Sequence, residues 1–367
     1  MSSTDLFLNK PTPSQLGEKG RVATLGMFII DHFEVTDPDG QKRQTEEEAV
    51  PMIAARMFLS PSHVGLVVDK GTDFPPAFEN KLSVLGEGVY WRAREGGTTR
   101  ALNVYSGSEV GEGHQSFRYL TPSLQIHLSD LVCPPSPWAQ DRPEWVHVVV
   151  RYPRAHAIVA ERDAIARGEV EGVVSSWKPK MIWEPLDVQR IGVDEWCRLA
   201  VNFEVISPNL LELQHILHLN HDTQQDTTAQ TESAATRLHS LLEPLAQSSG
   251  RTIPTIVLRA GKYGSYTISP TWKGWTPAYW QEEEQGRVVD PTGGGNGFLG
   301  GFAAGMILSG DDARFATICG SAAASFMIQQ RGLPVYGLSG QDGVGGRWNG
   351  DDPWARARDI AARMQEP

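Results

Sequence analysis

The sequence predicts an α/β fold built around a mainly parallel sheet, and two observations lead to that prediction. Short, nearly continuous apolar runs rich in β-branched residues recur along the chain, which is typical of strands buried on both faces of a sheet. A glycine-rich turn near residue 294 then leads into a helix of small residues. With 367 residues, 40% of them hydrophobic, the chain can bury the core of one large domain or of two smaller ones. The expected strands are residues 22–30, 64–68, 145–150, 180–183, 203–206 and 255–258.

Helices are expected between these strands. Residues 155–168 follow a helical period with Arg162 on the polar side, and residues 312–331 form a helix of small residues. Residues 352–364 predict a final amphipathic helix.

Three polar segments are expected outside the core. Residues 1–20 are expected to be a flexible lead, and residues 221–235, which are poor in apolar side chains, a surface excursion. Residues 36–49 are rich in turn formers, so Glu46, Glu47 and Glu48 indicate a solvated helix start rather than a metal cluster.

Composition narrows the class of partners. The net charge of −11 argues against a nucleic-acid or anionic-membrane surface. The three cysteines are far apart and form no CxxC pair, which fits buried thiols in a reducing compartment. No apolar run approaches the roughly 18 residues of a membrane span, and the N-terminus has no signal-peptide pattern. We therefore expect a cytoplasmic protein with no nucleic-acid or membrane partner.

The chain is organised around residues 288–305, VVDPTGGGNGFLGGFAAG. The pattern predicts the end of a short apolar strand, a glycine turn, and a helix from about residue 297. Gly293, Gly294 and Gly295 have no β-carbon, so their backbone N–H groups can approach a ligand closely. Together with the positive end of the helix they predict a phosphate-binding anion hole, with a plain tight turn as the alternative.

This segment resembles the second signature of the ribokinase-like (PfkB) carbohydrate kinases, which runs roughly D-T-x-G-A-G-D-x-F. Asp290, Thr292, Gly293, Gly295 and Phe298 match that signature. Within the family the chain looks most like a fungal branch named for maintenance of the killer virus, in which GGGN and an opening like GMFIID are usual. The resemblance spans roughly residues 21–335 and implies a three-layer αβα domain with a small β lid, placed at roughly residues 88–122.

The resemblance implies ATP and Mg²⁺ as cofactors, with Thr292 beside the nucleotide. Asn209 and Glu212 match an N-x-x-E element that orients magnesium waters, since Mg²⁺ keeps several waters and needs few protein ligands. Their alternative is a capped helix start with Glu212 as a surface acid. Gly261 and Gly264 resemble a turn beside the nucleotide.

Further along the chain, the helix at residues 312–331, with Ala324, would flank adenine by the same resemblance.

The substrate side matches the family less well. Asp31 follows the first expected strand, where a family aspartate binds sugar hydroxyls; its alternative is a turn cap. In the lid, Thr99, Arg100 and Asn103 are hydrogen-bonding candidates or part of an ordinary hairpin. The glycines of the first family signature are absent, since residues 46–58 are EEEAVPMIAARMF. Glu184 is a further carboxylate at the end of a strand, or else a loop acid fixed by Pro185.

The chemistry depends on Asn296, which stands where the family has its catalytic aspartate. A neutral amide cannot accept the substrate's proton, and such general-base help is worth about 10²–10⁴-fold. The nearest acid, Asp290, is mainly structural in the family, and deamidation at Asn296–Gly297 is a further route to an aspartate.

Two functions stay open: an impaired ATP-dependent kinase of a sugar or nucleoside-like alcohol, and a pseudokinase. The second would bind a nucleotide or a protein partner in a scaffolding role, including one in virus-particle stability.

Overall fold

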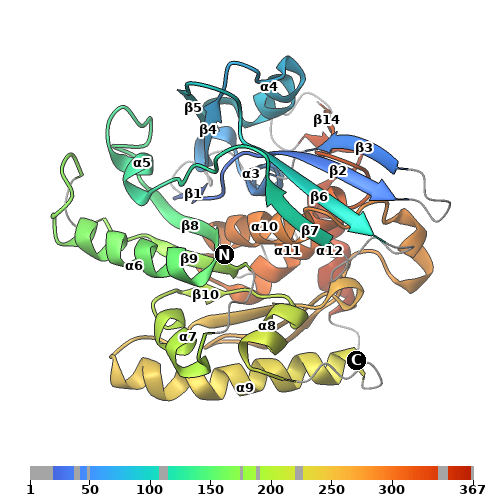
Figure 1. Ribbon diagram of the computed structural model, residues 1–367. Helices are drawn as coiled ribbons and strands as arrows, with labels where there is room; N and C mark the ends of the chain where they lie inside the picture. The colour runs from blue at the N-terminus through green and yellow to red at the C-terminus, as the bar shows by residue number, and fades with distance from the viewer. Residues whose placement is uncertain are drawn as a thin grey trace.

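A nine-stranded sheet, counted over the described residues, forms the centre of this computed structural model (Figure 1). The structure describes residues 20–36, 42–47, 50–106, 115–173, 177–186, 191–219, 226–337 and 346–364. The strand order is β13-β12-β11-β10-β9-β8-β1-β4-β5, with all pairs parallel except β11–β12 and β12–β13 at one edge. In chain order the strands are β1 (Arg21–Thr24), β4 (Val64–Lys70), β5 (Val89–Ala93), β8 (Pro143–Val150), β9 (Lys180–Pro185), β10 (Val205–Ile206), β11 (Thr255–Arg259), β12 (Ser265–Ile268) and β13 (Lys273–Thr276).

Helices cover both faces of the sheet and complete three layers. Successive strand residues alternate between the two cores, so Leu66 packs on one face and Val67 on the other. One face carries α3 (Pro51–Arg56), α4 (Pro76–Leu82), α10 (Gly294–Ser309), α11 (Ala313–Met327) and α12 (Pro353–Arg363). The opposite face carries α5 (Leu128–Val132), α6 (Tyr152–Ala166), α7 (Val193–Ala200), α8 (Leu210–Ile216) and α9 (Thr227–Ser248). The predicted αβα class is confirmed.

Short elements connect these layers. The 3-10 turns are η1 (Pro61–His63), η2 (Ser83–Gly88), η3 (Gly261–Tyr263) and η4 (Glu282–Arg287), and a small ladder joins β14 (Tyr336–Gly337) to β15 (Arg347–Trp348). No helix among the described residues is long and apolar enough to cross a bilayer. Cys197 and Cys319 are buried free thiols, and burial raises the pKa of Cys197 to about 12.

A second sheet of four strands lies apart from the central one and forms the lid (Figure 1). Its order is β3-β2-β6-β7, built from β2 (Ile30–Thr36), β3 (Lys42–Glu47), β6 (Arg100–Ser106) and β7 (Gln115–Tyr119). The lid therefore includes residues 30–36 and 42–47, which the predicted range of 88–122 left out. Conversely, β5 lies inside that range but pairs with β4 in the central sheet.

The apolar run at residues 22–30 is not one strand, contrary to the prediction. The Thr24 hydroxyl accepts a hydrogen bond from the Gly26 N–H at 2.9 Å, and the chain leaves the central sheet there. It enters the lid at Ile30, whose N–H donates to the Thr99 carbonyl. Asp31 is therefore a residue of lid strand β2, not the end of a central strand.

Other expectations also need correction. Glu46 and Glu47 belong to lid strand β3 rather than to a helix start, and Glu48 lies outside the described residues. Of the surface excursion predicted at residues 221–235, residues 221–225 lie outside the described residues, and residues 227–235 instead form the first turns of α9, where small side chains such as Ala234 are buried. Arg162 is fully buried and donates to the Asn202 carbonyl at 2.7 Å.

Two further predictions concern the N-terminal residues and the residues just before the glycine loop. Residues 1–19 of the predicted lead lie outside the described residues, and residues 288–290 form no strand.

Helix α10 packs unusually closely against its neighbours because its glycines lack side chains. A β-carbon on Gly300 would lie 2.0 Å from the Pro51 carbonyl oxygen of α3. One on Gly301 would lie 2.6 Å from the Cys319 carbonyl oxygen of α11. These contacts fix the position and direction of α10 relative to α3 and α11. They therefore also fix the position of the loop that precedes α10.

We expect Gly300→Ala to destabilise the protein by about 1–3 kcal/mol, because the added methyl group meets fixed backbone. In an open helix the same change stabilises by roughly 0.5–1 kcal/mol, so the sign of the effect is diagnostic. Urea unfolding measures it, with Gly286→Ala as the control, since a β-carbon there meets nothing within 4 Å. A more stable Gly300→Ala protein would contradict the close packing of α3 on α10.

Candidate active site

The glycine loop forms the N-terminus of α10. Gly293 is the N-cap with a left-handed backbone, φ 77°, which only glycine adopts readily. Gly294 and Gly295 are the first helical residues, so the helix begins three residues earlier than predicted. The first N–H groups of a helix have no partner within it, and together with the helix dipole they favour an anion.

The polar side chains before and after the loop differ in their hydrogen bonds. The Asp290 carboxylate accepts a hydrogen bond from the Thr292 N–H at 2.8 Å, so Asp290 shapes the turn. Asn296 is in the first turn of α10, and its Oδ1 atom is buried with no hydrogen-bond partner in the described part of the chain. An unsatisfied buried acceptor costs about 1–3 kcal/mol, so Oδ1 is suited to accept a bond from a ligand group.

A chain of buried polar groups lies directly behind the loop. Thr24 Oγ1 lies 3.1 Å from His147 Nδ1, and His147 Nε2 lies 3.1 Å from Glu184 Oε2. Glu184 Oε1 then pairs with Arg259 Nη1 at 3.0 Å. These four residues come from β1, β8, β9 and β11, so the chain crosses the sheet at its carboxyl end. Glu184 is thus a strand-end carboxylate in a buried network rather than a loop acid.

Glu184 is ionised in this network. Burial alone raises the pKa of its carboxyl, but Arg259 and His147 together outweigh burial and leave that pKa below its usual value. Its side chain is 8% exposed, so little solvent screens the pair.

Arg259 is in contact with the glycine loop itself. A β-carbon on Gly295 would lie 2.0 Å from Arg259 Nη1, so the guanidinium occupies the space that a side chain at position 295 would need. Arg259 Nη2 also donates to the Ser207 carbonyl at 3.1 Å. A side chain at position 295 would therefore displace the Arg259 guanidinium, so packing favours glycine there. The sequence pattern did not single out Arg259; its place at the end of an apolar strand was the available signal.

Asn209 and Glu212 form a reciprocal cap at the start of α8. Asn209 Oδ1 accepts from the Glu212 N–H at 2.8 Å, and Glu212 Oε2 accepts from the Asn209 N–H at 2.7 Å. The same Oε2 atom lies 3.6 Å from Arg259 Nη2. Asn209 is the N-cap of α8, and the nearby Ser207 hydroxyl donates to the Val257 carbonyl. The structure brings this pair close to the glycine loop through Arg259.

The other residues predicted to lie beside the nucleotide are at the two ends of η3 and on α11. Gly261 and Gly264 bound η3 after β11, and both have positive φ. A β-carbon on Gly264 would lie 2.1 Å from the Thr276 carbonyl oxygen. Ala324 of α11 is half-buried, with its Cα 3.6 Å from a β-carbon built on Gly297 of α10. These residues lie on elements that adjoin the glycine loop.

The predicted substrate residues lie on the lid. Asn103 Nδ2 donates to Asp31 Oδ1 at 2.9 Å across the parallel pair of β2 and β6. Arg100 pairs with Asp73 at 3.2 Å. The Thr99 hydroxyl accepts a bond from Arg94 at 2.7 Å and is buried, so Thr99 is engaged within the lid base.

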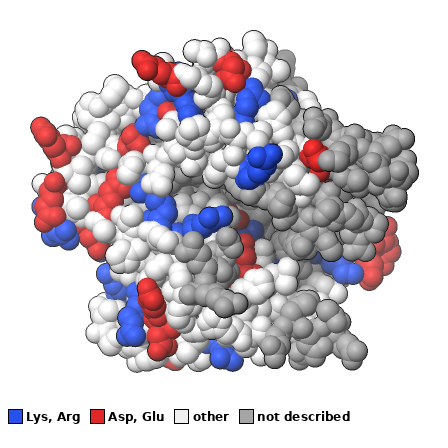
Figure 2. Space-filling view, viewed as in Figure 1, with Lys and Arg blue, Asp and Glu red and all other residues white. Residues whose placement is uncertain are grey.

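Tyr119 and Arg151 were missed by the sequence reasoning. Burial raises the pKa of the Tyr119 hydroxyl, Asp31 raises it further, and Arg151 partly offsets both. Asp31 from β2, Tyr119 from β7 and Arg151 from the end of β8 are therefore electrostatic neighbours. Figure 2 shows one face of the molecule, which is hollowed near its centre and has both basic and acidic side chains around the hollow.

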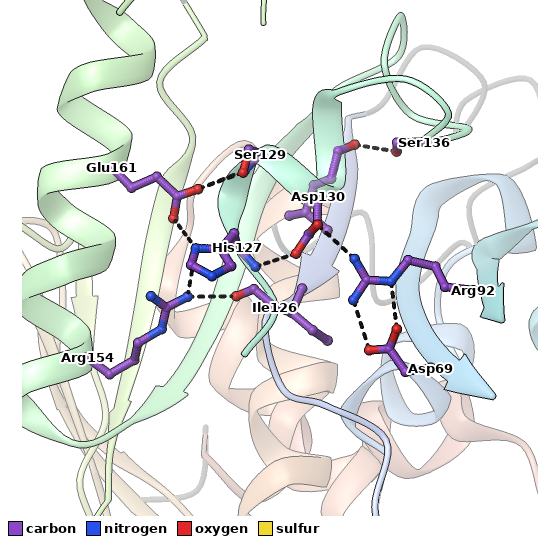
Figure 3. Close-up of polar contacts among 10 residues, drawn as sticks. Asp69, Arg92, Ile126, His127, Ser129, Asp130, Ser136, Arg154 and Glu161 are labelled. Atoms are coloured by element: carbon purple, nitrogen blue, oxygen red, sulfur yellow. Dashed lines mark hydrogen bonds and ion pairs between the residues drawn. The ribbon is translucent and has the colours of Figure 1, made fainter. Parts of the chain in front are cut away.

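A second ion-pair network fixes the segment that follows the lid (Figure 3). Arg92 of β5 forms two 2.8 Å bonds with Asp69 of β4 and pairs with Asp130 of α5 at 2.7 Å. Asp130 also accepts from the His127 N–H, and the His127 ring lies 3.5 Å from Glu161 of α6. The network joins the β4–β5 edge of the sheet to α6 through α5.

Comparison with known proteins identifies the family. The model of the pfkB family of carbohydrate kinases matches residues 192–335. Over 355 residues the chain is 31% identical to Protein MAK32 of Saccharomyces cerevisiae, covering 90% of this chain and 89% of the yeast protein. This chain belongs to the pfkB carbohydrate kinase family. The predicted family and its MAK32-like branch are therefore confirmed.

Solved structures show the same fold. The ribokinase of Giardia lamblia superposes with a TM-score of 0.59 at 15% identity. The superposition covers 95% of this chain and 100% of the Giardia chain. The ribokinase of Cryptococcus neoformans in complex with ADP gives a TM-score of 0.55 at 17% identity, covering 86% and 95%. At these identities the likeness concerns the ribokinase fold alone.

The lowered pKa of Glu184 gives this pfkB protein a specific acid response. The folded-state pKa lies below the unfolded value, so between the two pKa values the unfolded chain binds more protons. The stabilisation from Glu184 is present at neutral pH and is lost as the pH falls through the folded-state pKa. We expect Glu184→Gln to lower the free energy of unfolding by about 3–5 kcal/mol at pH 7, because Arg259 is left buried without its partner.

The free energy of unfolding, measured against pH, tests this expectation. The loss caused by Glu184→Gln should begin to shrink as the pH falls below about 4.3, the usual glutamate pKa, because the unfolded chain then takes up the proton, and it should be smallest below the lower folded-state pKa. Glu169→Gln is the control, because Glu169 also pairs with an arginine but is exposed. A Glu184→Gln protein as stable as wild type at pH 7 would contradict the inferred role of the buried pair.

Proposed function

We propose that this chain binds ATP with Mg²⁺ at the glycine loop and is an impaired kinase of a sugar or nucleoside-like alcohol. The observation that carries the proposal is the loop at residues 293–295, which opens a 16-residue helix and leads directly to Asn296. Two features fit a phosphate there: the left-handed Gly293 that turns the chain into α10, and the positive N-terminal end of that helix. The unsatisfied Asn296 Oδ1 is an acceptor, so it fits a donor such as a substrate hydroxyl.

The residues present fit a magnesium ion that would be held mainly through water molecules and phosphate groups. Among the described residues, no three His, Cys, Asp or Glu side chains gather into a metal cluster. Mg²⁺ in kinases is held through one or two carboxylates together with substrate phosphates, and Glu212 beside Asn209 can supply one. Bound magnesium-ATP would supply the phosphoryl group and neutralise part of its charge.

The protein's own contribution is positioning and electrostatic stabilisation, which dominate phosphoryl transfer. The N–H groups of the loop would hold phosphate oxygens, with Thr292, Gly261, Gly264 and Ala324 lining the nucleotide. Asp31 and Asn103 would orient the acceptor hydroxyl from the lid, with Thr99 and Arg100 supporting them.

Asn296 sits at the position from which a base would accept the hydroxyl proton, and an amide has no basic lone pair for it. Turnover should therefore be slow.

A second candidate is a pseudokinase that binds nucleotide or a protein partner without catalysis. The same Asn296 favours it. The fungal relative and the ribokinase neighbours support the fold and family on which both candidates depend.

Calorimetric titration with magnesium-ATP tests the binding site. We expect saturable binding to the wild-type protein and its loss in Gly295→Val, because the new side chain fills the loop and displaces Arg259. Gly286→Val is the control, since position 286 faces open space. Wild-type protein that binds no magnesium-ATP would rule out the kinase and the nucleotide-binding pseudokinase, and would leave only a pseudokinase that binds a protein partner.

Asn296→Asp tests the chemistry. If the remaining site is competent, restoring a carboxylate should raise ADP formation by about 10²–10⁴-fold with ribose or adenosine as trial acceptor. Asn80→Asp, on an exposed face of α4, is the control and should change nothing. An unchanged rate in a variant that still binds ATP would favour the pseudokinase.

A further inference from the structure

The guanidinium of Arg259 lies against the proposed anion hole, beside the glycine loop and the N-x-x-E pair. Arg259 Nη1 occupies the space beside Gly295 in the first turn of α10. The guanidinium carries a full positive charge at any physiological pH. The side chain is 13% exposed, so solvent screens that charge only weakly.

This placement is electrostatically unfavourable by itself. The N-terminus of a helix carries a partial positive charge, and a cation beside it is repelled. The structure compensates with Glu184, which is buried on the sheet side and ionised. Glu184 and the Ser207 carbonyl hold the guanidinium, and Glu184 Oε1 itself lies 3.3 Å from a β-carbon built on Gly295. The helix end thus meets the Arg259–Glu184 ion pair at the loop backbone, and Arg259 Nη1, at 2.0 Å, is the nearer of the two charged groups.

The carboxylate of the predicted magnesium pair is already close to this cation. Glu212 Oε2 lies 3.6 Å from Arg259 Nη2 and also caps the Asn209 N–H. Positive charge at this site therefore comes in part from the protein, in the region where a kinase of this kind would otherwise depend on its metal ion.

We propose that Arg259 is a phosphate-positioning residue whose charge lets the glycine loop bind a diphosphate group without a divalent metal. This inference rests on the proposed nucleotide site and adds a property to it: metal-independent binding. Arginine suits the role because its planar guanidinium matches the geometry of phosphate oxygens and is held rigidly here. Magnesium would strengthen binding at the site, with Arg259 supplying the part that remains in its absence.

The test is calorimetric titration of the full chain with ADP, once in excess EDTA and once with magnesium. Wild-type protein should bind ADP saturably in both. Arg259→Gln should weaken binding in EDTA at least tenfold and weaken it less with magnesium. Arg259→Lys, which keeps the charge, should retain binding in EDTA better than Arg259→Gln. Pyrophosphate and adenosine, titrated separately in EDTA, identify the recognised group, and pyrophosphate alone should show the dependence on Arg259.

Two variants guard against a folding defect. Glu184→Gln/Arg259→Gln removes both charges of the buried pair, so no unpaired charge remains, and it should lose EDTA binding as the single variant does. Arg167→Gln is the matched control, because Arg167 also pairs with a glutamate but lies exposed at the end of α6.

The outcomes separate this inference from the proposed function. Wild-type binding that requires magnesium would overturn the inference and leave the nucleotide site standing, and it needs no variant. EDTA binding that survives in both glutamine variants would overturn it as well. Absence of binding both in EDTA and with magnesium would overturn the inference and the nucleotide site together.

Discussion

A single buried carboxylate, Glu184, connects the parts of this protein that meet at the carboxyl end of the central sheet. It contacts His147 of β8 and Arg259 of β11 from its own place at the end of β9. Arg259 then reaches Ser207 and lies against Gly295 of α10. Removal of one member of a buried charged network leaves its partner uncompensated, which costs several kcal/mol. The position of the glycine loop relative to the sheet is therefore coupled to the charge state of Glu184.

The fold was largely predictable because its signals are local. Parallel strands buried on both faces must be apolar throughout, and the runs at β4, β8, β9 and β11 show this pattern directly. The glycine loop was found for the same reason, since a chain that bends sharply into a tightly packed helix needs glycine at several positions. The prediction was wrong where a single apolar run contributes residues to both sheets. Residues 22–30 are apolar throughout, but a hydrogen bond from the Gly26 N–H to the Thr24 hydroxyl divides them between the central sheet and the lid.

The candidate site was predictable only in part, because its polar network depends on strand order. Glu184 and Arg259 are 75 positions apart in the sequence, and nothing near either residue indicates the other. They meet because β9 and β11 both flank β10 in the sheet. Arg162 shows the same limitation: the helical period of α6 predicted an exposed side chain, yet Arg162 is buried and donates to the backbone of Asn202. Long-range pairing of charges leaves no periodic signal along the chain.

Asn296 and Arg259 act in the same electrostatic direction. A carboxylate at position 296 would sit in the first turn of α10 and would repel phosphate groups held by the neighbouring N–H groups. An active kinase accepts that repulsion because the same carboxylate accepts the proton during transfer. With an amide at 296 that repulsion would disappear, while the Arg259 guanidinium, paired with Glu184, lies against Gly295. At the proposed site both features would favour a bound anion, and the amide would weaken the chemical step. On electrostatic grounds, the proposed site would therefore retain a phosphate compound better than it would turn one over.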